Sequence, residues 1–154
     1  MSDYPLPNIS TDLTGQVAFV TGTTSGLGRR FAKVLAACGA RVAITGRRVE
    51  RLNALAEEIR ASGGICEPIV IDMTSRASIL EALAKAQETL GTVQILVNNA
   101  GIPDAERAVK ISYALTDAVF YTHLIGPSLL SCEVATPLIK HGLSGPIVHI
   151  ASAA

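Results

Sequence analysis

Apolar residues along the chain fall into two alternating patterns. Short continuous apolar runs predict strands, and longer stretches with apolar residues three or four positions apart predict helices. The expected strands are 17–20, 41–45, 68–71, 93–97 and 146–150, and the expected helices are 26–38, 49–62, 75–90 and 115–140. Pro127 lacks a backbone N–H and is expected to kink the last helix.

Strands that alternate with helices through short connections are typical of the α/β class. We therefore expect a doubly wound parallel sheet in three α/β/α layers, with right-handed crossovers and strand order 3-2-1-4-5. Residues 1–15 are a polar lead-in, and residues 16–154 form one domain. Ligands of such sheets bind at the carboxyl ends of the strands, here between the first and fourth.

Composition narrows the class of protein. The 154 residues carry a net charge of +0, which argues against binding to nucleic acid or to an acidic membrane surface. The sequence has no apolar run of 18 residues and no signal-like N-terminus, so we expect a soluble, cytoplasmic protein. Cys38, Cys66 and Cys132 lack metal-ligand spacing, so we expect reduced, mostly buried thiols and no metal site.

A glycine-rich loop follows the first expected strand. It reads Thr21-Gly22-Thr23-Thr24-Ser25-Gly26-Leu27-Gly28 and leads into a helix. Glycine allows backbone angles that a Cβ forbids and lets a pyrophosphate approach the main chain, and the helix N-terminus attracts an anion. A tight turn before any helix has a similar pattern, but the flanking strands complete a βαβ unit, which favours a phosphate-binding loop.

The end of the second strand bears on the choice of dinucleotide. A carboxylate here would bind the ribose hydroxyl of NAD, but the chain has Gly46-Arg47-Arg48. Arginine binds a 2′-phosphate bidentately, so NADP(H) is favoured and NAD(H) remains possible. The alternative is that Arg48 and Arg51 are only the solvated face of a helix start.

Polar residues also follow the third and fourth strands. Asp72, before Met73, can accept a hydrogen bond from an adenine amino group, although Asp72 or Thr74 could equally cap the next helix. Asn98-Asn99-Ala100-Gly101 combines amides that bridge strand ends with small residues that leave space for a flat ring.

Taken together, the glycine loop and Asn98–Gly101 closely resemble the classical short-chain dehydrogenase/reductase family, from about Leu13 to the last residue. The resemblance implies a Rossmann-type fold and hydride transfer between NAD(P)(H) and an alcohol or carbonyl substrate. By this resemblance, Asn98 holds the sheet together. The implied cofactor contacts are Thr24, Ser25 and Leu27 at the phosphates, Arg47 and Arg48 at the 2′ position, Asp72 and Met73 at the adenine, and Asn99, Ala100 and Gly101 at the ribose.

The resemblance also indicates catalytic residues. Ile150-Ala151-Ser152 matches the family's catalytic serine, and His123-Leu124-Ile125-Gly126 stands where the family has a relay asparagine. His123 could keep a relay, or it could be a buried, hydrogen-bonded structural residue. The family's Tyr-x3-Lys pair, expected after Ser152, is absent, and none of the three tyrosines has a lysine four residues on.

Three hypotheses follow. The chain is the cofactor-binding part of an oxidoreductase whose C-terminal strands and catalytic Tyr and Lys lie outside it, a non-catalytic NAD(P)-binding module, or an inactive fragment. The first is favoured because Ser152 occupies a catalytic position. By resemblance, we expect a homo-oligomer formed through the 115–140 helix, with Val119, Leu124, Leu130 and Val134 at the interface. Strand 146–150 would form an exposed apolar edge, so we expect the 154-residue chain to be inactive alone and to self-associate.

Overall fold

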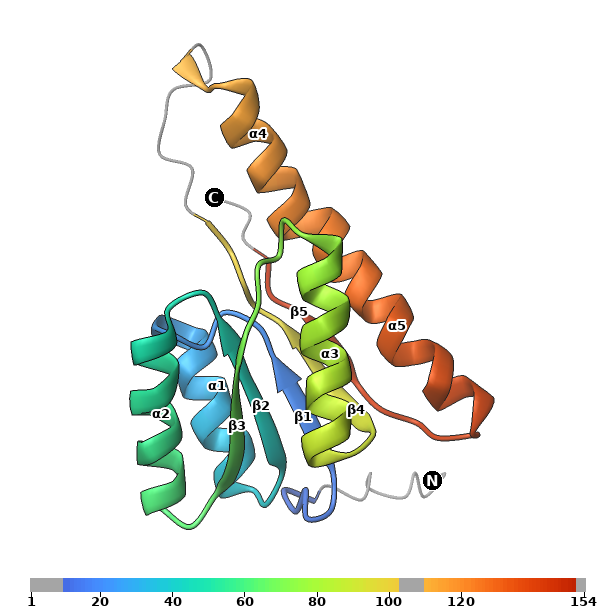
Figure 1. Ribbon diagram of the computed structural model, residues 1–154. Helices are drawn as coiled ribbons and strands as arrows, with labels where there is room; N and C mark the ends of the chain where they lie inside the picture. The colour runs from blue at the N-terminus through green and yellow to red at the C-terminus, as the bar shows by residue number, and fades with distance from the viewer. Residues whose placement is uncertain (1–9, 103–109, 152–154) are drawn as a thin grey trace, which may run out of the picture.

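A parallel sheet flanked by helices makes up the computed structural model, which describes residues 10–102 and 110–151 (Figure 1). The strands are β1 (Val17–Val20), β2 (Arg41–Gly46), β3 (Ile65–Val70), β4 (Val93–Asn98) and β5 (Ile147–His149). The helices are α1 (Gly26–Ala37), α2 (Val49–Ala61), α3 (Arg76–Leu90), α4 (Tyr113–Phe120), the π turn η2 (Tyr121–Ile125) and α5 (Gly126–Lys140).

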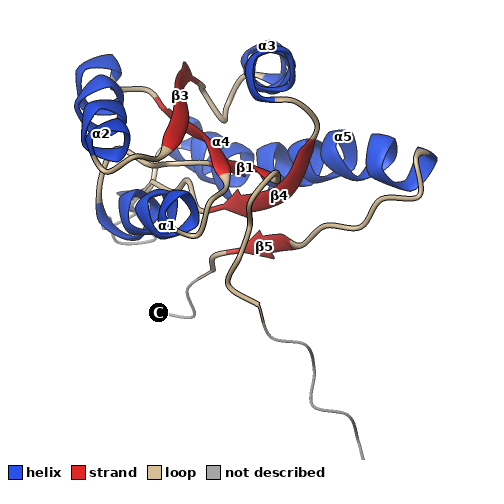
Figure 2. Ribbon diagram, turned by 90° about the horizontal axis from the view of Figure 1, so that it is seen from below, coloured by secondary structure: helices blue, strands red, loops and turns tan. Residues whose placement is uncertain are grey.

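The strand order is β3-β2-β1-β4-β5, and all four pairings are parallel, so the predicted topology is confirmed. Successive residues of a strand point to opposite faces, and β1 shows the result. Val17 and Phe19 belong to the core under α3 and α5, whereas Ala18 and Val20 belong to the core under α1 and α2. Figure 2 shows these helix pairs on opposite sides of the sheet, as expected for three layers.

Strand β3 begins three residues earlier than predicted, and Pro68 lies within it. Proline cannot donate a hydrogen bond to a neighbouring strand, which is tolerated at the edge of a sheet. β3 is such an edge, with β2 as its one neighbour in the described sheet. The apolar pattern alone placed the start at Pro68 because the polar Glu67 interrupts it.

The predicted 115–140 helix begins at Tyr113 and is interrupted by η2 rather than at Pro127 itself. Within the π turn, the Gly126 N–H donates to the Tyr121 carbonyl, five residues back. Pro127 is the second residue of α5 and directly follows the π turn, and the kink expected there is wrong. Figure 1 shows α4 and α5 following one another along nearly one line, so the interruption widens the helix without a sharp turn.

Two of the four residues predicted for an oligomer interface lie in the core instead. Leu130 and Val134 are fully buried beneath α5, in the cluster that includes α3 and β4. Leu124 is exposed and Val119 is half-buried, so only these two of the four are accessible to a partner.

The three cysteine thiols also differ from expectation: Cys66 is buried, but Cys38 is half-buried and Cys132 is exposed.

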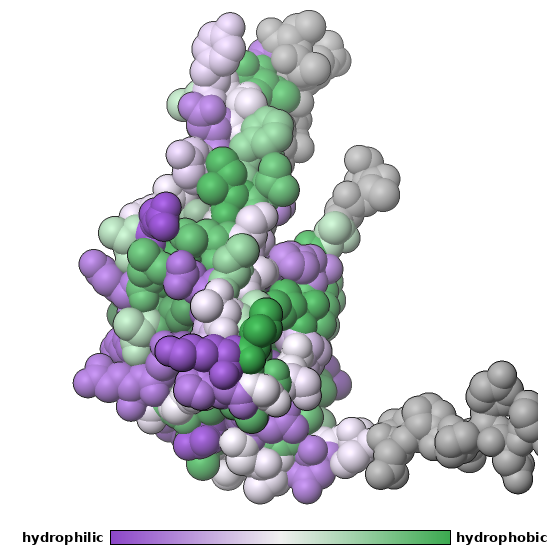
Figure 3. Space-filling view, turned by 90° about the vertical axis from the view of Figure 1, so that its right-hand side faces the viewer, coloured by the Kyte–Doolittle hydropathy of each residue, from purple (hydrophilic) through white to green (hydrophobic). Residues whose placement is uncertain are grey.

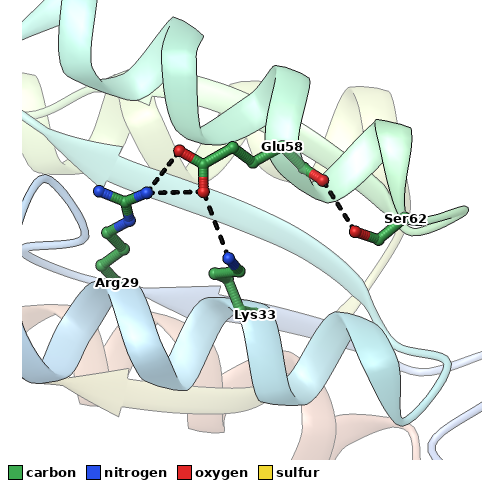
Figure 4. Close-up of polar contacts among 4 residues, drawn as sticks. All are labelled: Arg29, Lys33, Glu58 and Ser62. Carbon is green, nitrogen blue, oxygen red and sulfur yellow. Dashed lines mark hydrogen bonds and ion pairs between the residues drawn. The ribbon is translucent and has the colours of Figure 1, made fainter.

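Ion pairs tie α1 to α2 on one face of the sheet (Figure 4). Both carboxylate oxygens of Glu58 accept hydrogen bonds from Arg29, and one also accepts from Lys33 at 3.2 Å. Hydrogen bonds from Arg29 and then Lys33 lower the pKa of Glu58. Because these side chains are exposed, solvent screening keeps their contribution to stability modest.

Within the described ranges, no helix is both long and apolar enough to cross a membrane.

Candidate functional site

A cavity of about 610 Å³ lies where four parallel strands end. Segments that follow β1, β2, β3 and β4 meet there, as expected at the switch point of a doubly wound sheet. The lining residues are Gly22, Thr24, Ser25, Gly46, Arg47, Arg48, Ile71, Asp72, Met73, Asn99, Ala100, Gly101, Ile102 and Thr122. Most of the residues singled out in the sequence are therefore brought together.

The loops after β1 and β4 are held against each other by Thr21, which is fully buried. Its hydroxyl oxygen accepts hydrogen bonds from the backbone N–H groups of Asn99 and Ala100, both at 2.9 Å. The Asn99 amide nitrogen in turn donates to the Thr21 carbonyl at 3.0 Å and to the Gly22 carbonyl at 3.3 Å. This role of Thr21 was not predicted from the sequence. A polar residue directly after an apolar strand is the signal that could have indicated it.

Close backbone approach explains two of the three glycines. A Cβ on Gly22 would lie 2.8 Å from the Ala100 Cα, and a Cβ on Gly28 would clash with the backbone carbonyl oxygen of Gly22 and with the side-chain nitrogen of Asn99. Gly26 has a φ of +55° and open space where its Cβ would be. Gly26, Gly28 and Leu27, whose side chain is exposed, do not line the cavity.

The N-terminus of α1 is available to an anion. Its N-cap residue Ser25 makes no side-chain capping bond, and the first turn holds no acidic residue. The first backbone N–H groups of a helix have no partner within the helix and favour negative charge. An uncapped helix start beside a loop whose Gly26 has no Cβ therefore fits a phosphate group.

Arg48 joins the end of β2 to the glycine loop. Its Nε lies 3.1 Å from the Thr24 hydroxyl, and its Nη2 donates to the same hydroxyl and to that of Ser25 at 3.2 Å. Arg47 is exposed and also lines the cavity. Arg48 is thus more than a solvated helix start, whereas Arg51 is exposed and lies outside the cavity lining.

Asp72 closes the turn between β3 and α3 and also lines the cavity. Its Oδ1 accepts from the Thr74 backbone N–H at 2.9 Å and from the Thr74 hydroxyl at 2.7 Å. These two bonds lower the pKa of the Asp72 carboxyl, with a smaller contribution from the charge of Arg47. The N-cap of α3 is Ser75, which accepts from the Ser78 N–H, so neither Asp72 nor Thr74 is the N-cap.

His123 contacts the loop that follows β4. Its Nε2 lies 3.1 Å from the Ile102 nitrogen and 3.2 Å from the Ile102 carbonyl oxygen. A Cβ on Gly101 would lie 2.8 Å from the His123 ring, so the ring sits over this glycine. The alternative of a hydrogen-bonded His123 fits these contacts, but the expected burial is wrong, because the residue is exposed.

Sequence reasoning did not assign Gly46, Ile71, Ile102 and Thr122 to the cavity. The glycine at position 46, at the end of a strand, is a signal that could have indicated this place. A Cβ there would lie 2.7 Å from the Thr24 methyl group. Ser152 lies outside the described residues. Within the part of the chain that the structure describes, no group of three or more His, Cys, Asp or Glu side chains is arranged to hold a metal ion.

Comparison with protein families gives a clear result. The short chain dehydrogenase family model matches residues 16–154, and the chain belongs to this family. It is 36% identical over 142 residues to a sorbitol dehydrogenase of Cereibacter sphaeroides, covering 92% of this chain and 54% of that protein. It is also 36% identical over 141 residues to the 3-oxoacyl-[acyl-carrier-protein] reductase FabG of Aquifex aeolicus, covering 91% of this chain and 56% of that protein. The chain thus spans about half the length of these curated relatives.

Solved structures show the same fold. A metagenomic short-chain oxidoreductase in complex with NADP superposes with a TM-score of 0.87 at 36% identity, covering 94% of this chain and 65% of that one. A mutant actinorhodin polyketide ketoreductase with NADPH gives a TM-score of 0.84 at 34% identity, covering 89% of this chain and 53% of that one. Both of these neighbours hold the phosphorylated dinucleotide.

Proposed function

We infer that the chain is the cofactor-binding part of an oxidoreductase that transfers a hydride between NADP(H) and an alcohol or carbonyl substrate. NAD(H) is the alternative cofactor. The observation that carries this proposal is the cavity across four strand ends, with Arg47 and Arg48 on one wall and the glycine loop on another. The bound nicotinamide supplies or accepts the hydride, and the residues of this chain hold and orient it.

Each wall of the cavity has chemistry suited to one part of the dinucleotide. The glycine loop and the uncapped α1 N-terminus bind the phosphates, and the two arginines bind the 2′-phosphate. Small residues after β4 leave room for the ribose and a flat ring. The proposed contacts are Gly22, Thr24 and Ser25 for the phosphates, Arg47 and Arg48 for the 2′-phosphate, Asp72 and Met73 for the adenine, and Asn99, Ala100 and Gly101 for the ribose. Gly26, Leu27 and Gly28 do not line the cavity and are proposed to act through the backbone of the α1 N-terminus.

Two further residues belong to the proposed chemistry. The Ser152 hydroxyl can donate a hydrogen bond to the reacting oxygen and stabilise charge that develops there. His123, through its contact with Ile102, supports the cavity wall after β4 rather than carrying the proton transfer by itself. Turnover unchanged or raised in His123→Asn of an active form of the enzyme agrees with this role. A collapse of turnover with normal folding contradicts it.

Titration of NADPH and NADH into the chain tests the choice of cofactor. Arg47→Ala and Arg48→Ala should each weaken NADPH binding by about tenfold to a hundredfold, because each removes a charge-assisted contact worth about 1.5–3 kcal/mol. Arg51→Ala is the matched control, since it removes an exposed positive charge outside the cavity. Tighter binding of NADH that is unchanged in Arg47→Ala contradicts the preference.

A non-catalytic NAD(P)-binding module is the second candidate. The cavity by itself is consistent with this candidate as well, because it provides for cofactor binding and not for proton transfer. We propose that a polypeptide of these 154 residues alone binds NADPH without reducing aldehydes or ketones. Turnover in a longer form that carries a Tyr-x3-Lys pair distinguishes the enzyme from the binding module.

We also propose a cytoplasmic homo-oligomer that forms through α4 and η2. α4 has no buried residue and extends away from the sheet, beyond the strand ends (Figure 1). Figure 3 shows apolar side chains over this projecting helix. The exposed large apolar and aromatic residues of this face are Tyr113, Phe120, Tyr121, Leu124 and Ile125. Exposed apolar side chains gathered on a projecting helix favour association.

A further inference from the structure

The Ser131 hydroxyl connects α5 to the ends of two strands. It donates to the Pro127 carbonyl oxygen at 2.7 Å, one helical turn back. The Asn98 side-chain nitrogen, at the end of β4, lies 3.1 Å from the Ser131 Oγ, and the His149 Nε2, at the end of β5, lies 3.4 Å from the Ser131 Oγ. One side chain on α5 thus contacts both β4 and β5, which are paired through Asn98 and His149.

The chemistry of a hydroxyl determines the direction of each bond. A serine hydroxyl has one proton to donate and two lone pairs that accept. The Pro127 carbonyl can only accept, so it takes the proton. Both remaining contacts must therefore donate to Ser131, which places the Asn98 NH₂ group, and not its oxygen, toward Ser131. His149 must then carry a proton on Nε2, which it does in the neutral Nε2–H form and in the charged form alike.

The contact between Asn98 and Ser131 is important because Asn98 is a buried polar residue, only 4% exposed. Among the described residues, Ser131 is its one side-chain hydrogen-bond partner, and its Oδ1 is buried without a partner. The Asn98 backbone carbonyl accepts from the Ile150 N–H at 2.9 Å, which holds the chain beyond β5. Loss of the Ser131 hydroxyl would leave both ends of the buried amide unpaired, which strongly favours displacement of the strand end.

We propose that Ser131 is a positioning residue, which locks the ends of β4 and β5 together and so holds the chain at Ile150, two residues before Ser152. This role rests on the proposed function, because Ser152 follows Ile150 by two residues and is assigned the reacting oxygen there. Ser131 does not line the cavity, so it acts through Asn98 and His149 and not on the cofactor.

Hydrogen exchange of the Ile150 amide in the 154-residue chain tests the lock. Ser131→Ala should speed this exchange at least about tenfold relative to amides of β1, whereas Ser131→Thr, which keeps the hydroxyl, should restore it. Thr136→Ala is the matched control, because the Thr136 hydroxyl donates to Cys132 one turn back at 2.7 Å on the same helix, away from the strand ends. Unchanged exchange in Ser131→Ala, or an equal change in Thr136→Ala, overturns the proposal.

The nitrogen chemical shifts of His149 provide a second readout that does not depend on folding of the variant. Wild type should show the proton on Nε2 in the neutral imidazole of His149. A neutral form protonated on Nδ1 overturns the proposal even if Ser131→Ala fails to fold.

Titration of NADPH separates the lock from the proposed function. The affinity of Ser131→Ala for NADPH should stay within about twofold of the wild-type affinity. Failure of wild type to bind NADPH would contradict the proposed function and leave the lock intact.

Discussion

Two glycines with left-handed backbone angles allow the cost of a torsion angle to be separated from the cost of a clash. Gly22 has a φ of +72° and Gly63 a φ of +82°, but only Gly22 has neighbours where a Cβ would lie. We expect Gly63→Ala to lower the free energy of unfolding by about 1–2 kcal/mol, from the torsion alone. Gly22→Ala should cost about 1–3 kcal/mol more, because the Ala100 backbone must move. Urea denaturation measures both, and equal losses would contradict the close approach of the two loops.

The Asp72 carboxyl makes stability depend on acidity. Hydrogen bonds from Thr74 depress its pKa in the folded state below the unfolded value. The stabilisation is therefore present above the unfolded pKa of about 4 and is lost as the pH falls through the lower folded pKa. Between about pH 5 and pH 2, a range that brackets this loss, we expect the thermal midpoint of wild type to fall more than that of Asp72→Asn. Asp117→Asn, which removes an exposed carboxylate on α4, is the control and should follow wild type.

At the scale of residues, the sequence predicted which side chains share the cavity better than what each one does there. Gly22, Arg48 and Asp72 carry their signal in their place after a strand, and the strand order then brings them together. Asp72 turned out to hold a turn as well, and Arg48 to hold the glycine loop. Such contacts depend on side-chain angles and on distances between loops, which no linear pattern contains.

At the scale of elements, the helical run formed by α4, η2 and α5 has buried and exposed positions that the apolar pattern does not distinguish. Leu130 is fully buried, whereas Leu124, on η2, is 57% exposed. We expect Leu130→Ala to lower the free energy of unfolding by about 2–5 kcal/mol, because it leaves a cavity in the core. Leu124→Ala should change the stability of the monomer by less than about 0.5 kcal/mol. Denaturation at low protein concentration measures both, and similar losses would contradict this division.

Most elements were predictable because their boundaries carry local chemical signals. Ser75 caps α3, and Gly91, with a φ of +98°, follows its last residue. The π turn at Tyr121–Ile125 was not predictable, because one hydrogen bond that spans five residues within a long helix leaves no mark on the apolar pattern. The early start of β3 was missed as well, since pairing with β2 recruits residues that lack an apolar pattern.

At the scale of the molecule, the exposed face of α4 and η2 predicts self-association. We expect the double variant Phe120→Asp with Leu124→Asp to sediment as a smaller species than wild type, because a charge on each side chain opposes burial. Ile139→Asp is the control: Ile139 is also highly exposed, but it lies near the far end of α5. Analytical ultracentrifugation decides, and a wild type that is monomeric at high concentration contradicts the proposed interface.

The strand order also determines the sequence of events during synthesis. β1 lies between β2 and β4, and β4 emerges from the ribosome after β2 and β3. The segment from residue 71 to 98 takes about 1–6 s to translate, so a nascent half-sheet exists for that time with one side of β1 unpaired. Val17–Val20, fully buried in the finished protein, are then an apolar edge open to other nascent chains. Chaperone binding during translation should therefore fall once Asn99 and Ala100 have emerged and can donate to the Thr21 hydroxyl.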